Sequence, residues 1–532
     1  MSMPPPGTVE LLEFSTNEVG EPIIIHLPVP TNDPNDPLNW PNWRKNLNFF
    51  FVFAFSAAVF TTLMIQSIFW QQMNEELGIT YQHLNWSVAV QSVGLAMGCM
   101  LFVPFTKKYG RRSSYILSMS VLTASYWWTS RLQSTAELYI TNLIQGLASA
   151  LNETLAQITI ADLYFVHQRG RANSWYMVAV VLGSYLLPVA GGAQAAYEGW
   201  RVSYYTCAAC MTVLCIVSIF FFEETKYIPV VDGVEQSLQS NGVMPRHDNG
   251  LDKDIKIDDD ASARDSFDYK KDDTSPVPPM KSYRERLAWT TKTEESLWEL
   301  FKAPILTTGL PAVAWTSLQY AAVVAWINVI SSVMSEYFSA PPYNMSTMGV
   351  GAMAVPGFIG AVLGSFYCGL FGDWLITYLA KKNGGIYEPE MRLYPLALPL
   401  ITMLPGAVMF GVCLERGEHW ILPAVGIGLF SFGMGALGDA TFTFCIDSYR
   451  ELTGEAFVMI SFWRNVVSIG IPFAIAPWEQ MGVGNMHIVL GVIQFALTVT
   501  FIPMIYWGKK LRAKSGPYYY ELVRRQVSPN KR

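Results

Sequence analysis

The sequence predicts an all-α membrane protein in which twelve helices form two pseudo-symmetric six-helix bundles. Two observations support this fold class. Of the 532 residues, 51% are hydrophobic and only 15% are charged, whereas a soluble domain usually carries about 25% charged residues. In addition, a charged turn occurs at matching places in the two halves: Lys107-Lys108-Tyr109-Gly110-Arg111-Arg112 in the first, and Gly372-Asp373-Trp374 followed by Lys381-Lys382 in the second.

The apolar residues fall into runs of about 20, the length that crosses about 30 Å of hydrocarbon. These runs predict twelve spans, at residues 46–69, 84–105, 113–130, 136–160, 173–195, 202–222, 305–333, 346–371, 393–414, 419–441, 454–478 and 485–507.

The spans divide the chain into five regions. Residues 1–45 are a polar, Pro-rich N-terminal tail, and 46–222 form the first six-helix bundle. Residues 223–303 are a linker whose Asp-, Lys- and Ser-rich middle has too little apolar surface to fold. Residues 304–508 form the second bundle, and 509–532 are a short C-terminal tail.

The Lys and Arg residues predict the orientation of the chain, because cytoplasmic loops carry the excess of positive charge. Only Arg131, Arg201 and Arg416 fall in the loops of one side, and Arg464 lies within a span. The other 32 of the 36 basic residues place both termini and the linker in the cytoplasm, in a multi-pass protein that we expect in the plasma membrane. Asn344 of Asn344-Met345-Ser346 is then a glycosylation candidate on the outer side.

Three of the charged residues that fall within predicted spans are candidates: Glu153, Arg464 and Asp439. A charge at the bilayer centre costs at least about 2.5–3.5 kcal/mol, so such residues are candidates for function. We expect Glu153 to bind and release a proton, and Arg464 to pair with Glu153 or with a substrate anion. A static buried ion pair is the alternative for both residues.

Uncharged polar side chains accompany these charges at helical spacing. Those of span 4 recur every three or four residues and share one face with Glu153, which predicts that the face lines a water-filled cavity. Ordinary helix packing is the alternative for any single residue. The cavity-lining candidates are Gln66, Asn142, Gln145, Asn152, Gln157, Gln319, Tyr320 and Asn465.

Five stretches outside the spans carry a resemblance to a known family. The chain resembles the major facilitator superfamily, and in particular its fungal drug:proton antiporter branch, over nearly its whole length. The resemblance implies two bundles that rock about a midplane cavity lined by spans 1, 4, 7 and 10. The stretches are Asp33 to Trp40, Asp162 to Gly170, Gly199-Trp200-Arg201, Glu224 to Tyr227, and Asn383 to Leu393.

Family motifs are present with departures. In the loop after span 2, Gly110, Arg111 and Arg112 match, but Lys107 stands where the family has an acid that helps to latch the two halves together. The second-half copy keeps Gly369 and Asp373. In span 4, Asn142 stands where the family has an arginine tied to proton coupling.

The antiporter motif of span 5 is represented by Gly183, Pro188, Gly191 and Gly192, while Leu187 replaces one of its glycines. Small residues let helices approach closely, and Pro188 frees a backbone carbonyl and bends the helix. Packing without an antiport role is the alternative for this motif.

The resemblance and the motifs predict a secondary transporter that exports a small organic compound, such as a drug, toxin or secondary metabolite, as protons enter. Proton-coupled uptake of an organic cation or amine is the alternative, and a non-transporting membrane sensor ranks third. We expect a monomer in the lipid bilayer with a small-molecule substrate and protons as its partners. No cofactor, metal or nucleic acid is expected, and the chain is not expected to be an enzyme, since it contains no phosphate-binding loop or metal motif.

Overall fold

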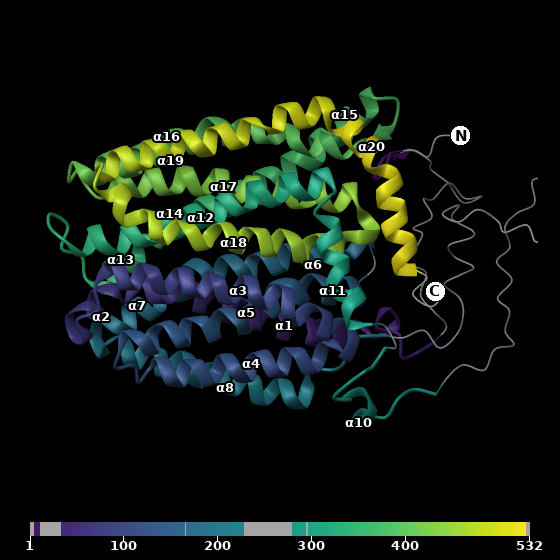
Figure 1. Cartoon of the computed structure of the whole chain (residues 1–532), viewed down its shortest axis with the longest axis horizontal. Coiled ribbons are helices and arrows are strands. Elements are labelled where there is room, and N and C mark those ends of the chain that lie inside the picture. Colours follow the sequence, from purple (N-terminus) through teal and green to yellow (C-terminus); the bar gives the residue numbers. More distant parts are fainter. Residues whose placement is uncertain (1–4, 11–32, 165, 228–278, 294–295, 528–532) are drawn as a thin grey trace, which may run out of the picture.

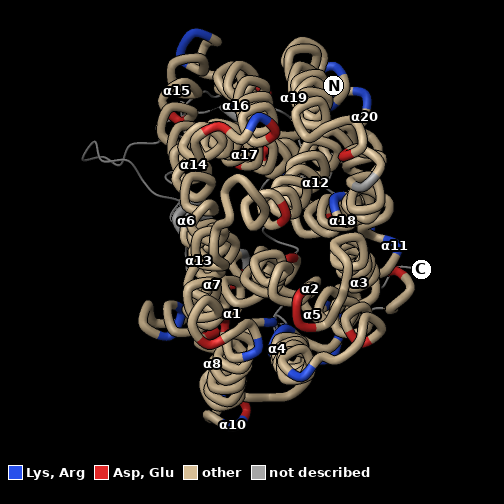
Figure 2. Tube along the Cα trace, turned by 90° about the vertical axis from the view of Figure 1, so that its left-hand side faces the viewer, with Lys and Arg blue, Asp and Glu red and all other residues tan. Residues whose placement is uncertain are grey.

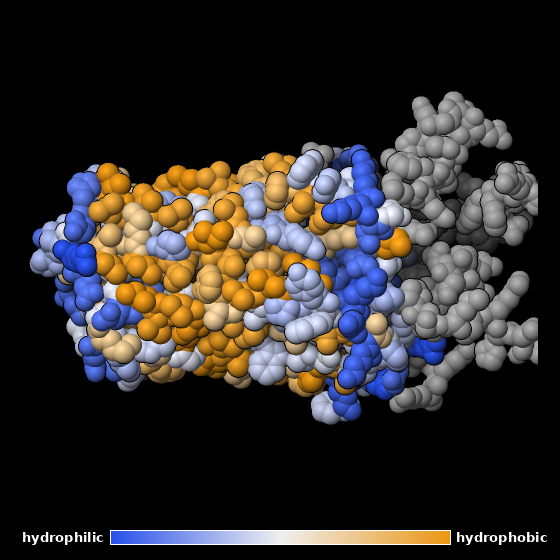
Figure 3. All heavy atoms as spheres, turned by 90° about the horizontal axis from the view of Figure 1, so that it is seen from above, coloured by the Kyte–Doolittle hydropathy of each residue, from blue (hydrophilic) through white to orange (hydrophobic). Residues whose placement is uncertain are grey.

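The computed structural model describes residues 5–10, 33–164, 166–227, 279–293 and 296–527. Most of the helices run along the long axis of the molecule (Figure 1). Hydrophobic residues cover the middle of the visible face, and hydrophilic residues gather at its two ends (Figure 3). This is the distribution expected of a protein that spans a bilayer.

The first half consists of six membrane-crossing segments. They are α1 (Asn42–Ile68), α3 (Tyr81–Tyr109), α4 (Arg111–Thr129), α5 (Thr135–Leu163), the broken segment α6–η2–α7 (Val166–Val181, Leu182–Leu186 and Leu187–Glu198), and α8 (Trp200–Phe221).

The second half repeats this arrangement. Its segments are α12 (Pro311–Ser339), the broken segment α13–α14–η3–α15 (Thr347–Ala352, Ala354–Phe366, Tyr367–Phe371 and Gly372–Lys382), α16 (Ala397–Glu415), α17 (Ile421–Ser448), α18 (Thr453–Glu479) and α19 (Val483–Val499).

Shorter elements join or flank these segments. They are β1 (Val9–Glu10), η1 (Pro37–Asn39), α2 (Trp70–Leu77), α10 (Tyr283–Arg286), α11 (Leu297–Thr307), β2 (Ile386–Tyr387), η4 (Pro389–Leu396), η5 (Arg450–Leu452) and α20 (Phe501–Val527). We call the end of the molecule that holds α10, α11 and α20 the tail side, and the end that holds α2 and α13 the far side (Figure 1).

Among the described residues, ten helical segments are long and apolar enough to cross a membrane. The short helix α4 and the polar helix α5 complete the set of twelve. Helix α5 is less apolar because its buried face carries amides, hydroxyls and Glu153. It can still lie at membrane depth because other helices, and not lipid, surround that face.

The two halves pack on one another along two seams. Seen from the far side, α1 to α8 form one bundle and α12 to α19 form the other, with α3 beside α18 and α7 beside α13 at the junction (Figure 2). Each half has its own apolar core, one around Phe55, Tyr115 and Trp200 and the other around Val329, Phe430 and Leu490. The halves are therefore separate units that meet at a narrower interface.

Both ends of the predicted linker are packed against the first half. Glu223 pairs with Arg44 of α1, and the Lys226 ammonium donates to the carbonyls of Lys107, Lys108 and Thr291. Residues 228–278, which include the charged middle of that linker, lie outside the described residues.

Glycines set the closest approach of α3 and α5. A Cβ atom on Gly146 would lie 2.1 Å from the backbone oxygen of Gln91, and one on Gly94 would lie 2.4 Å from that of Leu143. Because both contacts are with backbone, neither can be relieved by a side-chain rotation. The small residues of the sequence thus fix the packing of the helix that carries Glu153.

Gly146→Val is expected to destabilise the protein by about 1–3 kcal/mol or more, because the added atoms have no space between α3 and α5. Thermal unfolding of the purified protein in detergent measures the effect. Gly470→Ala is the matched control, since a Cβ atom there meets nothing within 4 Å. Equal melting temperatures for the two variants would contradict the close α3–α5 contact.

Candidate functional site

An ion pair joins the two halves in the interior of the molecule. Glu153 of α5 and Arg464 of α18 form a salt bridge, and their side chains are 4% and 5% exposed. Each residue is carried by the polar face of its helix, which the close packing of α3, α5 and α18 turns inward. The structure therefore brings together the two charges whose pairing was one of the alternatives that the sequence offered.

Neighbouring side chains hold this pair in place. The Arg464 Nε donates to Asn465 Oδ1 at 3.1 Å, and the Asn465 amide lies 3.5 Å from Glu153 Oε2 and 3.9 Å from the sulfur of Cys99. The Arg464 guanidinium lies 5.2 Å from the ring centre of Tyr320, close enough for a cation–π interaction. Two of the predicted cavity residues, Tyr320 and Asn465, are thus neighbours of the ion pair.

The other predicted residues of span 4 line the buried side of α5. Asn142 donates to the carbonyl of Leu138 in its own helix, and Gln145 donates to the Thr129 hydroxyl of α4. Asn152 accepts a hydrogen bond from Ser56 of α1 at 3.2 Å. Gln157, in the following turn, is half-buried.

The remaining candidates lie apart from the ion pair. The Gln66 amide donates to Ser87 of α3 at 2.8 Å. The Gln319 amide donates to the Leu497 carbonyl and to Thr500, which connects α12 to the α19–α20 junction. Asp439 has Arg392, Asp373 and Cys368 as its electrostatic neighbours, toward the tail side of the second half.

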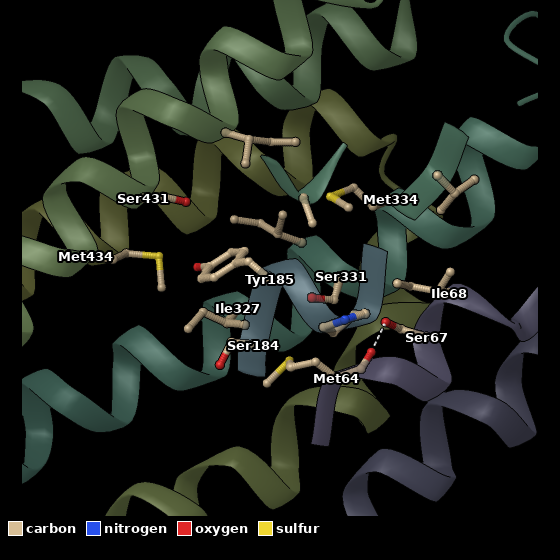
Figure 4. Close-up of a pocket in the computed structure, with 15 residues that line it drawn as sticks. Met64, Ser67, Ile68, Ser184, Tyr185, Ile327, Ser331, Met334, Ser431 and Met434 are labelled. Carbon is tan, nitrogen blue, oxygen red and sulfur yellow. Dashed lines mark hydrogen bonds between the residues drawn. The ribbon is translucent and has the colours of Figure 1, made fainter. Parts of the chain in front are cut away.

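A pocket lies between the halves (Figure 4). It is nearer to the far side of the molecule than the Glu153–Arg464 ion pair is. Its volume is about 50 Å³, and Tyr185 projects into it near Ser431 and Met434. Tyr185 belongs to the first half and lies near Ser431 of the second. The lining residues are Met64, Ser67, Ile68, Ser184, Tyr185, Pro188, Ile327, Ile330, Ser331, Met334, Val350, Ala354, Ile427, Ser431 and Met434.

The pocket lining contains four serines, three methionines and a tyrosine, but no charged residue. The pocket is also small, since sites for drug-sized ligands usually measure about 300–1,000 Å³. A drug-sized molecule would fit only after the halves move apart. Of the residues predicted from the sequence, Pro188 is the one that lines this pocket.

On the tail side, Lys107 forms a second ion pair between the halves. The last turn of α3 carries Lys107, and the first turn of α18 carries its partner Glu455. A cation at a helix C-terminus and an anion at a helix N-terminus are each favoured by the helix dipole. Lys107, at the position where the family has an acid, therefore joins the two halves directly.

The rest of the loop motif is held within the first half. The Arg111 guanidinium lies 3.2 Å from Asp162 at the end of α5, and Arg112 donates to the carbonyls of Phe222, Ile219 and Leu287. The Glu224 carboxylate accepts from the backbone N–H groups of Arg111 and Arg112. Burial raises the pKa of Glu224, although these hydrogen bonds and the Arg111 charge oppose the shift.

Gly110 is required at this loop for two reasons. Its φ of 119° is a conformation that residues with a side chain rarely adopt, and a Cβ atom would lie 2.2 Å from Glu224 Oε2. In the second half, Asp373 lies 3.3 Å from Arg392, which also pairs with Asp447 at the end of α17. The Arg111–Asp162 and Arg392–Asp447 pairs thus occupy matching ends of α5 and α17.

The span 5 motif forms the junction between α1 and the second half. A Cβ atom on Gly183 would lie 2.3 Å from the Ala57 carbonyl, and one on Gly192 would lie 3.1 Å from the Thr347 carbonyl of α13. Gly191 packs against Ile65. The π-helical turn η2 ends at Leu186, two residues before Pro188, and Leu187 donates its N–H to the Leu182 carbonyl five residues back.

The two bundles, the buried charges and the pocket between them define a multi-pass membrane transporter. A model of the Major Facilitator Superfamily matches residues 49–472. The chain belongs to this superfamily.

Related proteins agree with this assignment. A Schizosaccharomyces pombe protein described as an uncharacterized MFS-type transporter is 30% identical, over 94% of this chain and 90% of its own length. The MFS antiporter QDR3 of Candida albicans is 22% identical, over 89% of this chain and 79% of its own. The solved structure of the proton:xylose symporter XylE has a TM-score of 0.55 at 12% identity, and the match covers 88% of this chain and 97% of that one.

Sequence reasoning missed Glu455 and most of the pocket. Glu455 lies at the predicted start of span 11, where an acid is commonly a helix-terminal residue, so its partner could not be inferred. Serine and methionine in apolar helices give no signal of a cavity, because the same residues also pack against lipid or other helices.

The Lys107–Glu455 pair is expected to stabilise the arrangement that is closed on the tail side. Lys107→Glu places two carboxylates together and should open this side, whereas the charge reversal Lys107→Glu with Glu455→Lys should restore closure. Reaction of a cysteine introduced at Ser461, on α18, with a water-soluble maleimide measures opening. Equal labelling of the single and double variants would contradict a latch at this position.

Proposed function

We propose that this chain exports a small organic compound by alternating access, driven by proton entry. The observation that carries this proposal is the Glu153–Arg464 pair, which is buried and draws one partner from each half. Removing one partner of such a pair leaves an uncompensated buried charge, at a cost of about 3–5 kcal/mol. The pair therefore opposes any movement that separates α5 from α18.

Protonation of Glu153 provides the coupling. A neutral carboxyl group no longer attracts the Arg464 guanidinium, so the halves separate more easily. When the proton leaves, the restored attraction draws the halves together again. The proton gradient thus biases a rocking motion that would otherwise be reversible.

The pocket indicates the class of substrate. Its methionines adapt to irregular apolar shapes, while the hydroxyls of its serines and Tyr185 supply hydrogen bonds without charge. These features suit a neutral, amphipathic drug, toxin or secondary metabolite. The description of the related QDR3 protein as an MFS antiporter supports the exchange of one species for another.

Uptake of an organic cation or amine by proton symport is the second candidate. The carboxylates of Glu336 and Glu479, at the far-side ends of α12 and α18, are electrostatic neighbours and would attract a cation. The departures from the family motifs at Asn142 and Leu187 also keep this alternative open. A sensor that moves nothing ranks third.

We infer a plasma-membrane location with the tail side in the cytoplasm. The orientation rests on basic residues that lie at the tail side, including Lys107 to Arg112, Lys381-Lys382 and those of α20. Asn344 is exposed on the far side, in accord with its proposal as a glycosylation site. The partners proposed are the lipid bilayer, a small-molecule substrate and protons, and the chain is proposed to act as a monomer.

Accumulation of radiolabelled cycloheximide, a neutral compound, and tetraphenylphosphonium, a cation, in cells with and without this protein tests the direction of transport. Lower accumulation that a protonophore abolishes would support proton-driven export. Higher accumulation with the same sensitivity would support symport instead. Transport of either compound that is insensitive to the protonophore would contradict proton coupling.

Glu153→Gln is expected to abolish proton-driven flux while leaving substrate exchange at equal pH partly intact, because the amide cannot bind and release a proton. Arg464→Ala alone should lower stability by about 3–5 kcal/mol through the unpaired carboxylate. The double variant Glu153→Gln with Arg464→Gln should regain most of that stability without regaining coupling. Normal proton-driven flux in Glu153→Gln would remove this residue from the mechanism.

A further inference from the structure

Among the buried polar atoms of the first half that have no hydrogen-bond partner among the described residues, five gather on two helices. They belong to two adjacent helices, α3 and α5, and each side chain is at most 5% exposed. The atoms are Asn85 Oδ1, Gln91 Nε2, Asn142 Oδ1, Ser149 Oγ and Asn152 Nδ2. Buried groups of this kind are normally satisfied by ordered water, so the positions of these atoms indicate where water enters the bundle.

The contacts between α3 and α5 place these atoms in order of depth. Both helices begin on the far side, and Gln91 of α3 lies at the level of Gly146, one turn beyond Asn142. Further in, Cys99 of α3 shares Asn465 with Glu153. Asn85 is therefore nearest the far side, Gln91 and Asn142 follow, and Ser149 and Asn152 lie beside Glu153.

The spacing of the three α5 residues with unpartnered polar atoms keeps them on one side of the helix. Asn142, Ser149 and Asn152 are seven and three residues apart, so they lie within about 80° of one another around the axis. Glu153 follows Ser149 by four residues and lies directly above it on the same face. The distance from Asn142 to Glu153 is about 16 Å along the helix, at 1.5 Å per residue.

Helix α1 closes this region on the side of the pocket. Ser56 of α1 bonds Asn152, and ten residues further Gln66 bonds Ser87 of α3. The pocket begins at Met64 and lies between the halves, whereas the orphaned atoms lie within the first half. Among the described residues, no orphaned atom belongs to a residue that lines the pocket.

We propose that these residues form a hydrated polar track that carries protons from the far side to Glu153, separately from the pocket. This inference rests on the proposed proton coupling. A proton that reaches the track as hydronium passes between waters and the Ser149 hydroxyl, each of which both donates and accepts. The last water returns to neutral as Glu153 gains the proton and becomes a carboxylic acid. The ionic attraction between Glu153 and Arg464 is then lost.

The amides of the track position water and do not take up the proton. Gln91, Asn142 and Asn152 orient the waters, so they are positioning residues, whereas Ser149 is a relay. The titratable groups around Glu153 are Arg464 and Tyr320 of the second half, Cys99 of α3 and Tyr176 of α6. Arg464 provides the opposing charge that the arriving proton displaces.

Radiolytic hydroxyl-radical footprinting tests the hydration of the track in the full-length protein. Short X-ray pulses convert bound water to radicals that oxidise adjacent side chains, and cysteine reports them sensitively. Ser149→Cys is expected to oxidise at least tenfold faster than Thr154→Cys. Thr154 is the matched control, because it is buried in the same helix and its hydroxyl is satisfied by the carbonyls of Ala150 and Leu151. Equal rates would overturn the proposal.

Flux in proteoliposomes tests the role of the track, with radiolabelled cycloheximide and tetraphenylphosphonium as probes. Asn142→Leu combined with Ser149→Ala should slow flux driven by a pH gradient about tenfold, the effect of losing roughly one hydrogen bond. Exchange at equal pH should stay within twofold of wild type, and Thr154→Val should change neither. Unchanged gradient-driven flux would overturn the track and leave the proposed function standing.

The two proposals can fail separately. If wild-type flux ignores the pH gradient, proton coupling itself is wrong, and the track with it as a proton route. Equal loss of gradient-driven flux and exchange in the double variant would show a structural defect and overturn the positioning role.

Discussion

The cost of burying a charge is the constraint on which the rest of this structure depends. Glu153 and Arg464 are stable in the interior because each half supplies the other's counter-charge. The glycine contacts between α3 and α5, the position of Asn465 and the ring of Tyr320 all serve to hold that pairing in place. Separation of the halves at this depth requires the charge to be neutralised or hydrated, and the proposed coupling links movement to protonation in this way.

Three contacts at different depths along the axis of the molecule hold the two halves together. Lys107 and Glu455 meet on the tail side, Glu153 and Arg464 meet in the interior, and Gly192 of α7 packs against α13 on the far side. The ionic contacts respond to charge and water, whereas the glycine contact depends on shape alone. A rocking motion can therefore pivot on the far-side contact while the ionic contacts open.

The pocket and the polar track differ in the chemistry that each presents. The pocket offers thioethers, hydroxyls and aliphatic groups from both halves, and the track offers amides and a hydroxyl from α3 and α5. A neutral organic molecule and a proton need not compete for one site under this arrangement. In the proposed mechanism they interact through the position of α5. This helix carries Glu153 and packs against α1, and the last turn of α1 lines the pocket.

The sequence by itself determined the fold class, because span length and the distribution of charge follow directly from the thickness and polarity of a bilayer. It also singled out Glu153 and Arg464, since charges are rare at that depth. The tertiary structure decided which groups meet: the partnership of Lys107 with Glu455 joins residues 348 positions apart, and the pocket collects ordinary serines and methionines from four helical segments. These contacts depend on how the two bundles dock. The residue pattern of a single helix does not specify which surface of another helix will pack against it.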